Sequence, residues 1–399
     1  MTGRKAEILK ELEQGRITAS EAFTKLSQLP TNEGESVLSP PPAEPHSNSR
    51  NYEREPYEHN RHTHDNYEHE PNWVEGIISD VSGAVNEAIE SIRDMDIGIS
   101  ISDFIGGRYG RYVNTLQFQS APISQGVKKL VLIGKNARVD VHGYEGSVIR
   151  VWCKYDARRE DAVVHFGEEA GTYQLMYDEK MIRSMEIVCE VPHCIIQSAH
   201  IASKNGRLQL ENLQAGVLML YTKNARLTAA GITCDEFVAE NRSDQIRIHG
   251  IVAQNVHVET TNAKIQAENI RAKNAALTTT NAGIKTALID VEHLKLNTTN
   301  NGLKLEDYMQ GIETVWSGMR TLEAYTTNSG IALAVPADVG LKVQAEARGG
   351  KVTSKRHGMY FSESGKQRYA AGTSTNYEFG SKKLDVQLGT TNGTIKIRD

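Results

Sequence analysis

A nineteen-residue repeat restricts the possible folds of this chain more than any other feature. One corner position recurs at that interval: Asn205, Asn224, Ser243, Asn262, Asn281 and Asn300. Three residues after each corner stands an apolar residue: Leu208, Leu227, Ile246, Ile265, Ile284 and Leu303. More apolar pairs follow at fixed offsets, with a spacing of two inside each pair. Because that spacing is the period of a strand with one buried face, each unit is predicted to have three short strand-like sides.

A unit of this length cannot bury its apolar face alone, so consecutive units must stack and share one core. The sequence therefore predicts a mainly β fold, a single-stranded β-solenoid with 19-residue coils, over residues 112–399. Two stretches depart from the repeat, 142–200 and 336–384, and insertions in a regular scaffold commonly carry its specificity. The first reads as antiparallel strands at Val148–Cys153, Thr172–Tyr177 and Met185–Val191.

The corner asparagines have a structural and a functional interpretation. Stacked coils would align them into a ladder, in which each side-chain amide donates to one neighbour and accepts from the next. Asn also tolerates the left-handed backbone that sharp corners need. Since amides that pair with one another need no ligand, the sequence favours a structural ladder over a binding role.

Residues 1–30 are predicted to form a helical hairpin. Gly15 ends the first helix, and Thr18 with Glu21 forms a capping box that starts the second. So few residues bury too little surface for stability, which implies contact with a second copy, the rest of the chain or another protein. The candidate docking residues are Ile8, Leu12, Ile17, Thr18, Glu21 and Leu26.

Composition changes sharply after the hairpin. Seven of the ten prolines lie between Pro30 and Pro71, with few aliphatic residues, so 31–71 is predicted to be a disordered linker. Its histidines, His46, His59, His62, His64 and His69, leave weak metal binding as an alternative. Residues 72–111 are predicted to hold an amphipathic helix from Trp73 to about Asp94 and a glycine-rich hinge. The helix would cap the open end of the solenoid or form a homo-oligomer.

Charge and hydropathy exclude several classes of protein. The net charge of −5 disfavours nucleic-acid binding, and no apolar run reaches the roughly 20 residues of a membrane span. The N-terminus has no apolar core of a signal peptide. The four cysteines, Cys153, Cys189, Cys194 and Cys234, are expected to be reduced thiols, although Cys189 and Cys194 beside His193 leave a metal or redox site open.

No catalytic motif is present: neither a nucleophile elbow, nor a zinc-protease helix, nor a phosphate-binding loop. The chain is therefore expected not to be an enzyme and to need no cofactor. A polysaccharide-active enzyme would have to use His165, Glu168 and Glu169. A glycan binder would have to use exposed aromatic residues, for which the candidates are Tyr360, Phe361, Tyr369, Tyr377 and Phe379.

Two segments resemble a known family. Ala6–Ala22, a helix followed by a Glu-x-Gly-Arg-Ile-Thr-x-x-Glu-Ala turn, looks like the N-terminal helical domain of YvlB/LiaX-type proteins of Gram-positive bacteria. The Thr-Asn-Gly/Ala repeats, as at 261–263, 280–283 and 391–393, are similar to the candidate-adhesin β-domain paired with it. The resemblance implies a non-enzymatic protein of the cell-envelope stress response, whose helical part senses membrane-active peptides and whose β-domain restrains a membrane signalling system.

These observations favour a scaffold or regulatory binding protein, with the solenoid as a rigid surface and the hairpin as a docking module on a flexible tether. The expected partner is a protein, such as a membrane stress-signalling system, and the expected location is the cytoplasm, in association with the cell envelope. A surface adhesin or glycan-binding solenoid is the alternative, and a polysaccharide-active enzyme the third reading.

Overall fold

The computed structural model describes residues 112–123, 126–193, 196–306, 319–364 and 368–399. The chain divides into two units, Met1–Glu68 and His69–Asp399, and all described residues belong to the second. The predicted hairpin with its docking residues, the linker and the amphipathic helix with its hinge therefore lie outside the described residues.

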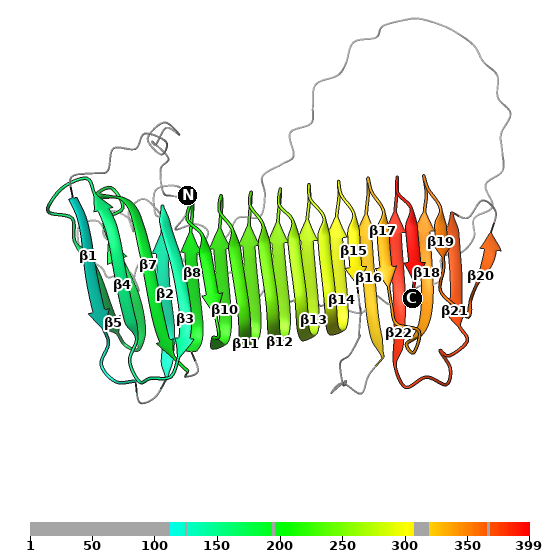
Figure 1. The fold of residues 1–399 in the computed structure, drawn as a ribbon, viewed down its shortest axis with the longest axis horizontal. Coiled ribbons are helices and arrows are strands. Elements are labelled where there is room, and N and C mark those ends of the chain that lie inside the picture. Colours follow the sequence, from blue (N-terminus) through cyan, green and yellow to red (C-terminus); the bar gives the residue numbers. More distant parts are fainter. Residues whose placement is uncertain (1–111, 124–125, 194–195, 307–318, 365–367) are drawn as a thin grey trace, which may run out of the picture. The chain divides into compact units, whose positions relative to one another are not determined.

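The described residues form strands β1 to β23 (Figure 1). The first ten are β1 (Tyr112–Gln119), β2 (Val127–Gly134), β3 (Ala137–Tyr144), β4 (Arg150–Ala157), β5 (Val164–Glu169), β6 (Thr172–Tyr177), β7 (Ile182–Pro192), β8 (Ile196–Ser203), β9 (Leu208–Glu211) and β10 (Gln214–Thr222). The central ones are β11 (Leu227–Asn241), β12 (Ile246–Thr260), β13 (Ile265–Thr279), β14 (Ile284–Thr298), β15 (Leu303–Glu306), β16 (Arg320–Thr326) and β17 (Ile331–Ala334). The last are β18 (Gly340–Ala347), β19 (Val352–Ser354), β20 (Met359–Ser364), β21 (Tyr369–Ser374), β22 (Lys383–Thr390) and β23 (Ile395–Arg398).

Strands β11 to β14 are four regular coils stacked in parallel register. Leu227 of β11 pairs with Ile246 of β12, which pairs with Ile265 of β13, so each residue lies beside the one nineteen positions later. The pairing of β11 with β12 skips Gly231 and Asp235, which divides each long strand into three paired sides. The predicted parallel coils of nineteen residues are thus confirmed.

The inward side chains of all three sides form one continuous core. Leu208, Leu227 and Ile246, at the same offset in successive coils, are fully buried, and so are Leu218 and Phe237 on another side. Burying an aliphatic side chain of this size contributes about 1.5–3 kcal/mol, so the stack is stabilised one coil at a time.

The left-handed corner does not lie at the corner asparagines. Positive φ angles recur instead seven residues later, at the non-glycine residues Asn212, Asn269 and Leu288 and at Gly231 and Gly250. These five positions are again nineteen residues apart, and Asn and Gly are the residues that adopt this conformation most readily. The prediction that the corner asparagines supply the left-handed backbone was therefore wrong; the hydrogen-bonding capacity of their side chains explains the repeat instead.

The two irregular stretches cover the ends of the stack with antiparallel strands. At one end β7 pairs with β3 in parallel and with β4 antiparallel, β4 pairs with β1, and β5 pairs with β6. At the other end β21 pairs antiparallel with both β18 and β20. The strand expected at Thr172–Tyr177 is β6, which also pairs in parallel with β2, so this stretch is only partly antiparallel.

The last coil in the sequence is not the last coil in the stack. β22 pairs with both β16 and β18, and β23 pairs with both β17 and β19 (Figure 1). The final strands β22 and β23 therefore lie between the coil of β16 and β17 and the coil of β18 and β19, although they follow both in the sequence. Simple repetition in the sequence would have placed this coil at the end.

Candidate functional site

The outer corner of each coil is built by a buried residue followed two positions later by the exposed corner residue. Buried Thr279 donates its hydroxyl hydrogen to the carbonyl oxygen of Ala263, at 3.1 Å, and Thr298 donates in the same way to Ala282, at 2.8 Å. Each bond joins a coil to the turn of the coil before it. At these two corners the threonine of the Thr-x-Asn pattern therefore stabilises the turn from inside, whereas the hydroxyls of Thr222 and Thr260, at the same offset, have no partner among the described residues.

The corner asparagines bond to one another along the stack. The amide Nδ2 to Oδ1 distances are 2.7 Å for Asn205–Asn136, 2.8 Å for Asn224–Asn205, 2.6 Å for Asn281–Asn262, 2.7 Å for Asn300–Asn281, 2.8 Å for Asn328–Asn300 and 2.9 Å for Asn392–Asn328. This row, the asparagine ladder, is interrupted at Ser243. In that coil the amide lies two residues earlier, where buried Asn241 donates to the carbonyl oxygens of Ala225 and Asp244.

A second, shorter set of polar pairs was missed by the sequence analysis. Asn274 donates to Asn255 at 2.8 Å, and at the same offset in later coils His293 Nδ1 lies 2.9 Å from Thr321 Oγ1. The nineteen-residue spacing of Asn255, Asn274 and His293 was the signal that could have revealed it.

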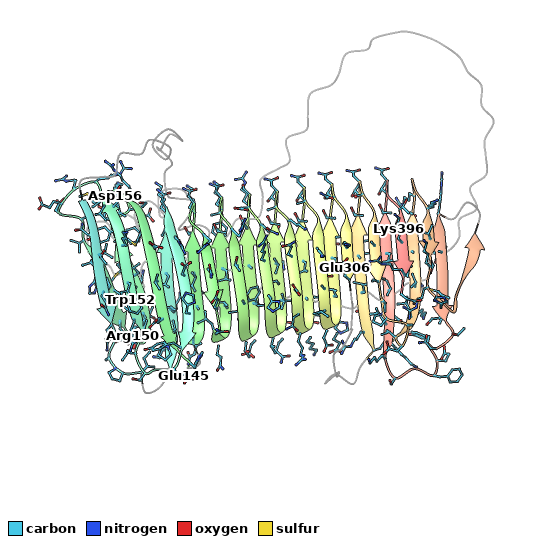
Figure 2. All side chains as sticks on the ribbon, in the orientation of Figure 1. Glu145, Arg150, Trp152, Asp156, Glu306 and Lys396 are labelled. Carbon is cyan, nitrogen blue, oxygen red and sulfur yellow. The ribbon has the colours of Figure 1, made fainter. Side chains whose placement is uncertain are left out.

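Beside the asparagine ladder lies an open groove of about 410 Å³, lined mainly by threonines. It crosses five successive coils, in which Thr280, Thr299, Thr327, Thr391 and Arg348 hold equivalent places. Figure 2 shows side chains recurring from one coil to the next along the stack. Parallel strands lie about 4.8 Å apart, so the groove extends for about 20 Å along the stack.

One aromatic side chain, Tyr325 of β16, lies in this groove. Tyr325 pairs with Gly389 of β22, and a Cβ atom at residue 389 would lie only 2.6 Å from Cδ1 of the tyrosine ring. The tyrosine ring can therefore lie directly over residue 389 only because this residue is a glycine. The phenol hydroxyl donates to Gln387 Oε1 at 3.2 Å, and 39% of the residue stays exposed. Burial, and then the negative charge of Glu323, raise the pKa of Tyr325, so the hydroxyl is protonated at neutral pH.

The groove has no excess charge. Its charged lining residues are Glu346 and Arg348, whose Oε1 and Nε atoms lie 3.0 Å apart in an exposed ion pair. The remaining lining consists of hydroxyl, amide, phenol and glycine groups. The groove thus offers one ring and a row of hydrogen-bonding groups to a ligand, with little electrostatic attraction for a strongly charged one.

Two other polar clusters stabilise the fold. Asp290 is fully buried and forms an ion pair with Arg320, which is also buried, while Arg271 Nε lies 3.7 Å from its other oxygen. The charges of this cluster are paired inside the protein, although Asp290 Oδ2, Arg320 Nη2 and Arg271 Nε have no hydrogen-bond partner among the described residues.

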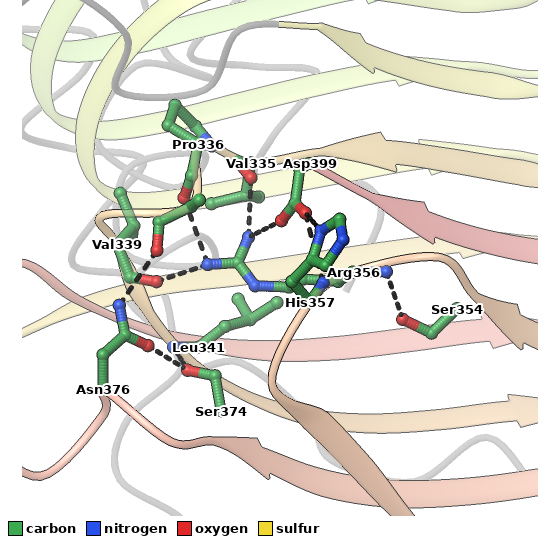
Figure 3. A network of polar contacts seen from close by, with 11 residues as sticks. Val335, Pro336, Val339, Leu341, Ser354, Arg356, His357, Ser374, Asn376 and Asp399 are labelled. Atoms are coloured by element: carbon green, nitrogen blue, oxygen red, sulfur yellow. Dashed lines mark hydrogen bonds and ion pairs between the residues drawn. The ribbon is translucent and has the colours of Figure 1, made fainter.

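The second cluster surrounds Arg356 (Figure 3). Its guanidinium donates to the carbonyl oxygens of Val335 at 2.6 Å, Pro336 at 3.1 Å and Val339 at 2.5 Å. Burial lowers the pKa of Arg356, and Asp399, 3.6 Å away, partly offsets that effect. Arg356 therefore holds the turn between β17 and β18, a structural role.

The residues predicted for a polysaccharide-active enzyme belong to an ordinary hairpin. His165, Glu168 and Glu169 lie on β5, and Glu168 Oε1 accepts a hydrogen bond from the backbone N–H of Gly171 at 2.6 Å. Since this bond closes the turn between β5 and β6, the structure assigns Glu168 a turn-stabilising contact.

The aromatic candidates in the second irregular stretch lie on different elements: β20, β21 and the loop that follows β21. Tyr369 begins β21 and is exposed, Phe379 is 93% exposed in the following loop, and the Tyr377 hydroxyl donates to Asp385 at 2.5 Å. Tyr360 and Phe361 lie on β20. Sequence reasoning overlooked Tyr325 because it stands inside the repeat, at a position where neighbouring coils carry Thr278 and Asn297.

The described cysteines are buried free thiols. Burial raises the pKa of Cys153 and of Cys234 to about 12 and raises that of Cys189 further. Cys194, which would complete the possible metal or redox site, lies outside the described residues. Over the ranges that the structure covers, no three His, Cys, Asp or Glu side chains gather as metal ligands would, and no helix is long and apolar enough to cross a membrane.

The sequence profile of the family described as Toastrack DUF4097 matches residues 159–398. No curated protein matches the chain. Among solved structures, a candidate adhesin from Bacteroides fragilis is 10% identical, with a TM-score of 0.36 over 72% of this chain and 98% of that one. A candidate adhesin from Parabacteroides merdae is 9% identical (TM-score 0.34; 72% and 97% covered). A candidate lipid-binding protein from Parabacteroides distasonis is 8% identical (TM-score 0.35; 71% and 96% covered).

Proposed function

This chain belongs to the Toastrack DUF4097 family, and we propose that it is a non-enzymatic binding scaffold of the cell-envelope stress response. The solenoid is its rigid interaction surface. The observation that carries this proposal is the groove beside the asparagine ladder, where side chains from five coils are held in one register and face outward. A surface made by stacked coils needs no reorganisation to bind, which lowers the entropic cost of association.

The use of the polar groups supports binding over catalysis. Buried Asp290 is paired with Arg320, and buried Arg356 holds three carbonyl oxygens. The groove, in contrast, exposes groups that suit recognition. A scaffold with these properties can present a partner or ligand without changing it chemically.

We assign residues 1–30 the docking role, on the resemblance of Ala6–Ala22 to the helical domain of YvlB/LiaX-type proteins. The partner is a membrane stress-signalling protein, and the chain works in the cytoplasm at the cell envelope. Tethered docking raises the local concentration of the partner near the solenoid. Self-association through the N-terminal helices is the competing use of the same segment.

Crosslinking in living cells tests this function, with and without envelope stress. The full chain should capture a membrane signalling protein that is lost from a chain lacking residues 1–30 and from Leu12→Asp. Lys10→Asp changes a charge in the same segment but alters none of the candidate docking residues, so it should retain capture. Equal capture by all four chains, or capture only of the chain itself, would contradict the proposed docking.

The second candidate function is a glycan-binding adhesin at the cell surface, and the exposed ring of Tyr325 in a groove lined by hydroxyl groups favours it. Proteolytic shaving of intact cells separates the two locations. A cytoplasmic scaffold is fully protected until the cells are lysed, whereas a surface adhesin is cleaved from outside.

A further inference from the structure

We propose that the groove beside Tyr325 binds a linear, uncharged glycan that lies along the stacking direction of the coils. The proposal rests on the surface role given to the solenoid above, but it does not need docking by residues 1–30. The glycan-binding proposal and the docking proposal can therefore be contradicted independently of each other. Its basis is the chemistry and spacing of the groups that line the groove.

The exposed hydroxyls of the groove are free to bind. Thr280, Thr299, Thr327 and Thr391 are exposed, and the backbone N–H groups of Thr299 and Thr327 bond to the carbonyl oxygens of Thr280 and Thr299, which places these residues side by side. Within the ranges that the structure describes, none of the four hydroxyls bonds to a protein group. A row of donors and acceptors at one strand spacing suits a ligand that carries a hydroxyl group on every unit.

Tyr325 supplies the apolar contact that such a ligand requires. Sugar rings have a face of C–H groups that packs on an aromatic ring, while their hydroxyls point sideways to polar neighbours. Because Gly389 makes room for the ring and Gln387 accepts from its hydroxyl, the ring is held in one orientation before a ligand arrives. This pre-organisation reduces the ordering cost of binding.

The charge of the groove selects an uncharged chain. Glu346 and Arg348 neutralise each other at 3.0 Å, and the other lining residues carry no charge. A polyanion would gain from Arg348 but would meet Glu346 at the same place. A neutral glycan is not repelled by either charge.

A peptide fits this groove poorly. Extended peptides usually bind by adding a strand to an open sheet edge, where unpaired backbone groups remain. The five strands under the groove, β13, β14, β16, β22 and β18, are each hydrogen-bonded to a neighbouring strand on both sides. Recognition here must therefore come from side chains, which favours a ligand rich in hydroxyls.

Calorimetric titration of the full chain tests the proposal. The probes are linear hexasaccharides of β-linked glucose and of β-linked N-acetylglucosamine, a polygalacturonate fragment of the same length, and a Gly/Ser-rich peptide. We expect binding of at least one neutral hexasaccharide and at least ten-fold weaker binding of the polygalacturonate and the peptide. Tyr325→Ala should weaken glycan binding at least ten-fold, while Tyr325→Phe keeps most of it.

Phe379→Ala is the control, because Phe379 is an exposed aromatic residue in the loop between β21 and β22, at the opposite end of β22 from the groove residues Gly389 and Thr391; it should bind as the unaltered chain does. Gly389→Ala should also weaken binding, since the added methyl group displaces the Tyr325 ring. The proposal is overturned if no neutral hexasaccharide binds, if the polyanion or the peptide binds best, or if Tyr325→Ala and Phe379→Ala bind alike. Circular dichroism of each variant checks that the solenoid is intact.

The two proposals are told apart by a chain that lacks residues 1–30. If it binds the hexasaccharide but captures no partner in cells, both proposals are supported. If the full chain binds the glycan but captures no partner, the glycan-binding proposal is supported and the docking proposal is contradicted. If it captures a partner but binds no glycan, the docking proposal is supported and the glycan-binding proposal is contradicted.

Discussion

Asp290 of β14 and Arg320 of β16 form a fully buried ion pair, although 30 residues separate them in the sequence. The segment 307–318 between them lies outside the described residues. The pair joins the last regular coil to the coil that resumes the repeat. A buried pair of this kind is costly to break from one side, because the remaining charge has no partner.

Removing one member of this pair should therefore destabilise the solenoid strongly. We expect Asp290→Asn and Arg320→Met each to lower the free energy of unfolding by about 3–5 kcal/mol, and Asp290→Leu/Arg320→Met to recover part of that loss. Urea unfolding followed by circular dichroism measures the change. Single variants within 1 kcal/mol of the unaltered chain would show that the pair is not important for stability.

Leu288 has a φ of 52° at a corner where Asn212, Gly231 and Asn269 stand in other coils. A left-handed backbone costs a leucine about 1–2 kcal/mol. Leu288→Asn should therefore raise the stability by about 1 kcal/mol, and the reverse change at an equivalent corner, Asn269→Leu, should lower it by a similar amount. Thermal unfolding of both variants tests this prediction. Shifts of the two melting temperatures in the same direction would contradict the argument from backbone conformation.

The interruption of the asparagine ladder at Ser243 offers a test of what the ladder contributes. Ser243→Asn should allow amide bonds to Asn224 and Asn262 and stabilise the chain by about 1 kcal/mol. Asn281→Ala should cost a similar amount per bond, because it removes the bonds to Asn262 and Asn300. If denaturation midpoints do not change in either variant, the ladder is a consequence of stacking and not a cause of it.

Two buried threonines at the same offset differ in their hydrogen bonds. Thr298 donates to Ala282, whereas the hydroxyl of Thr260 has no partner among the described residues. Thr298→Val should therefore cost about 1 kcal/mol, and Thr260→Val should be neutral or stabilising because it removes an unsatisfied buried group. Equal losses in the two variants would contradict this account.

Glu306, labelled in Figure 2, provides a pH test. Hydrogen bonds from Lys304 and then Lys285 lower its pKa from an ordinary value of 4.5 to about 2. A depressed carboxyl pKa stabilises the fold above pH 4.5, and this contribution is lost as the pH falls towards 2. Glu306→Gln should thus be less stable than the unaltered chain at pH 7, by no more than about 1 kcal/mol because solvent screens this pair, and equal to it only when the pH is below about 2. A difference that stays unchanged as the pH falls from 7 to below 2 would exclude the ion pairs as its cause.

Several parts of the fold and of the site follow from local patterns. Apolar residues such as Leu227 and Ile246 stand nineteen apart, and their burial explains the stack without further information. The Asn–Asn bonds were predictable because equivalent residues of stacked coils must lie side by side. Tyr325 was not predictable as a groove residue, since its surroundings depend on Gly389, which belongs to a coil 64 residues further along the chain, and on Gln387.

The sequence by itself determined the coil, its nineteen-residue length and its inward face, because these depend on the spacing of apolar and amide side chains along one short segment. The tertiary structure alone decided the order of the coils, the antiparallel strands at both ends and the groove. Those features arise from pairing between distant segments: β22 lies between β16 and β18, and no local spacing distinguishes that arrangement from simple succession.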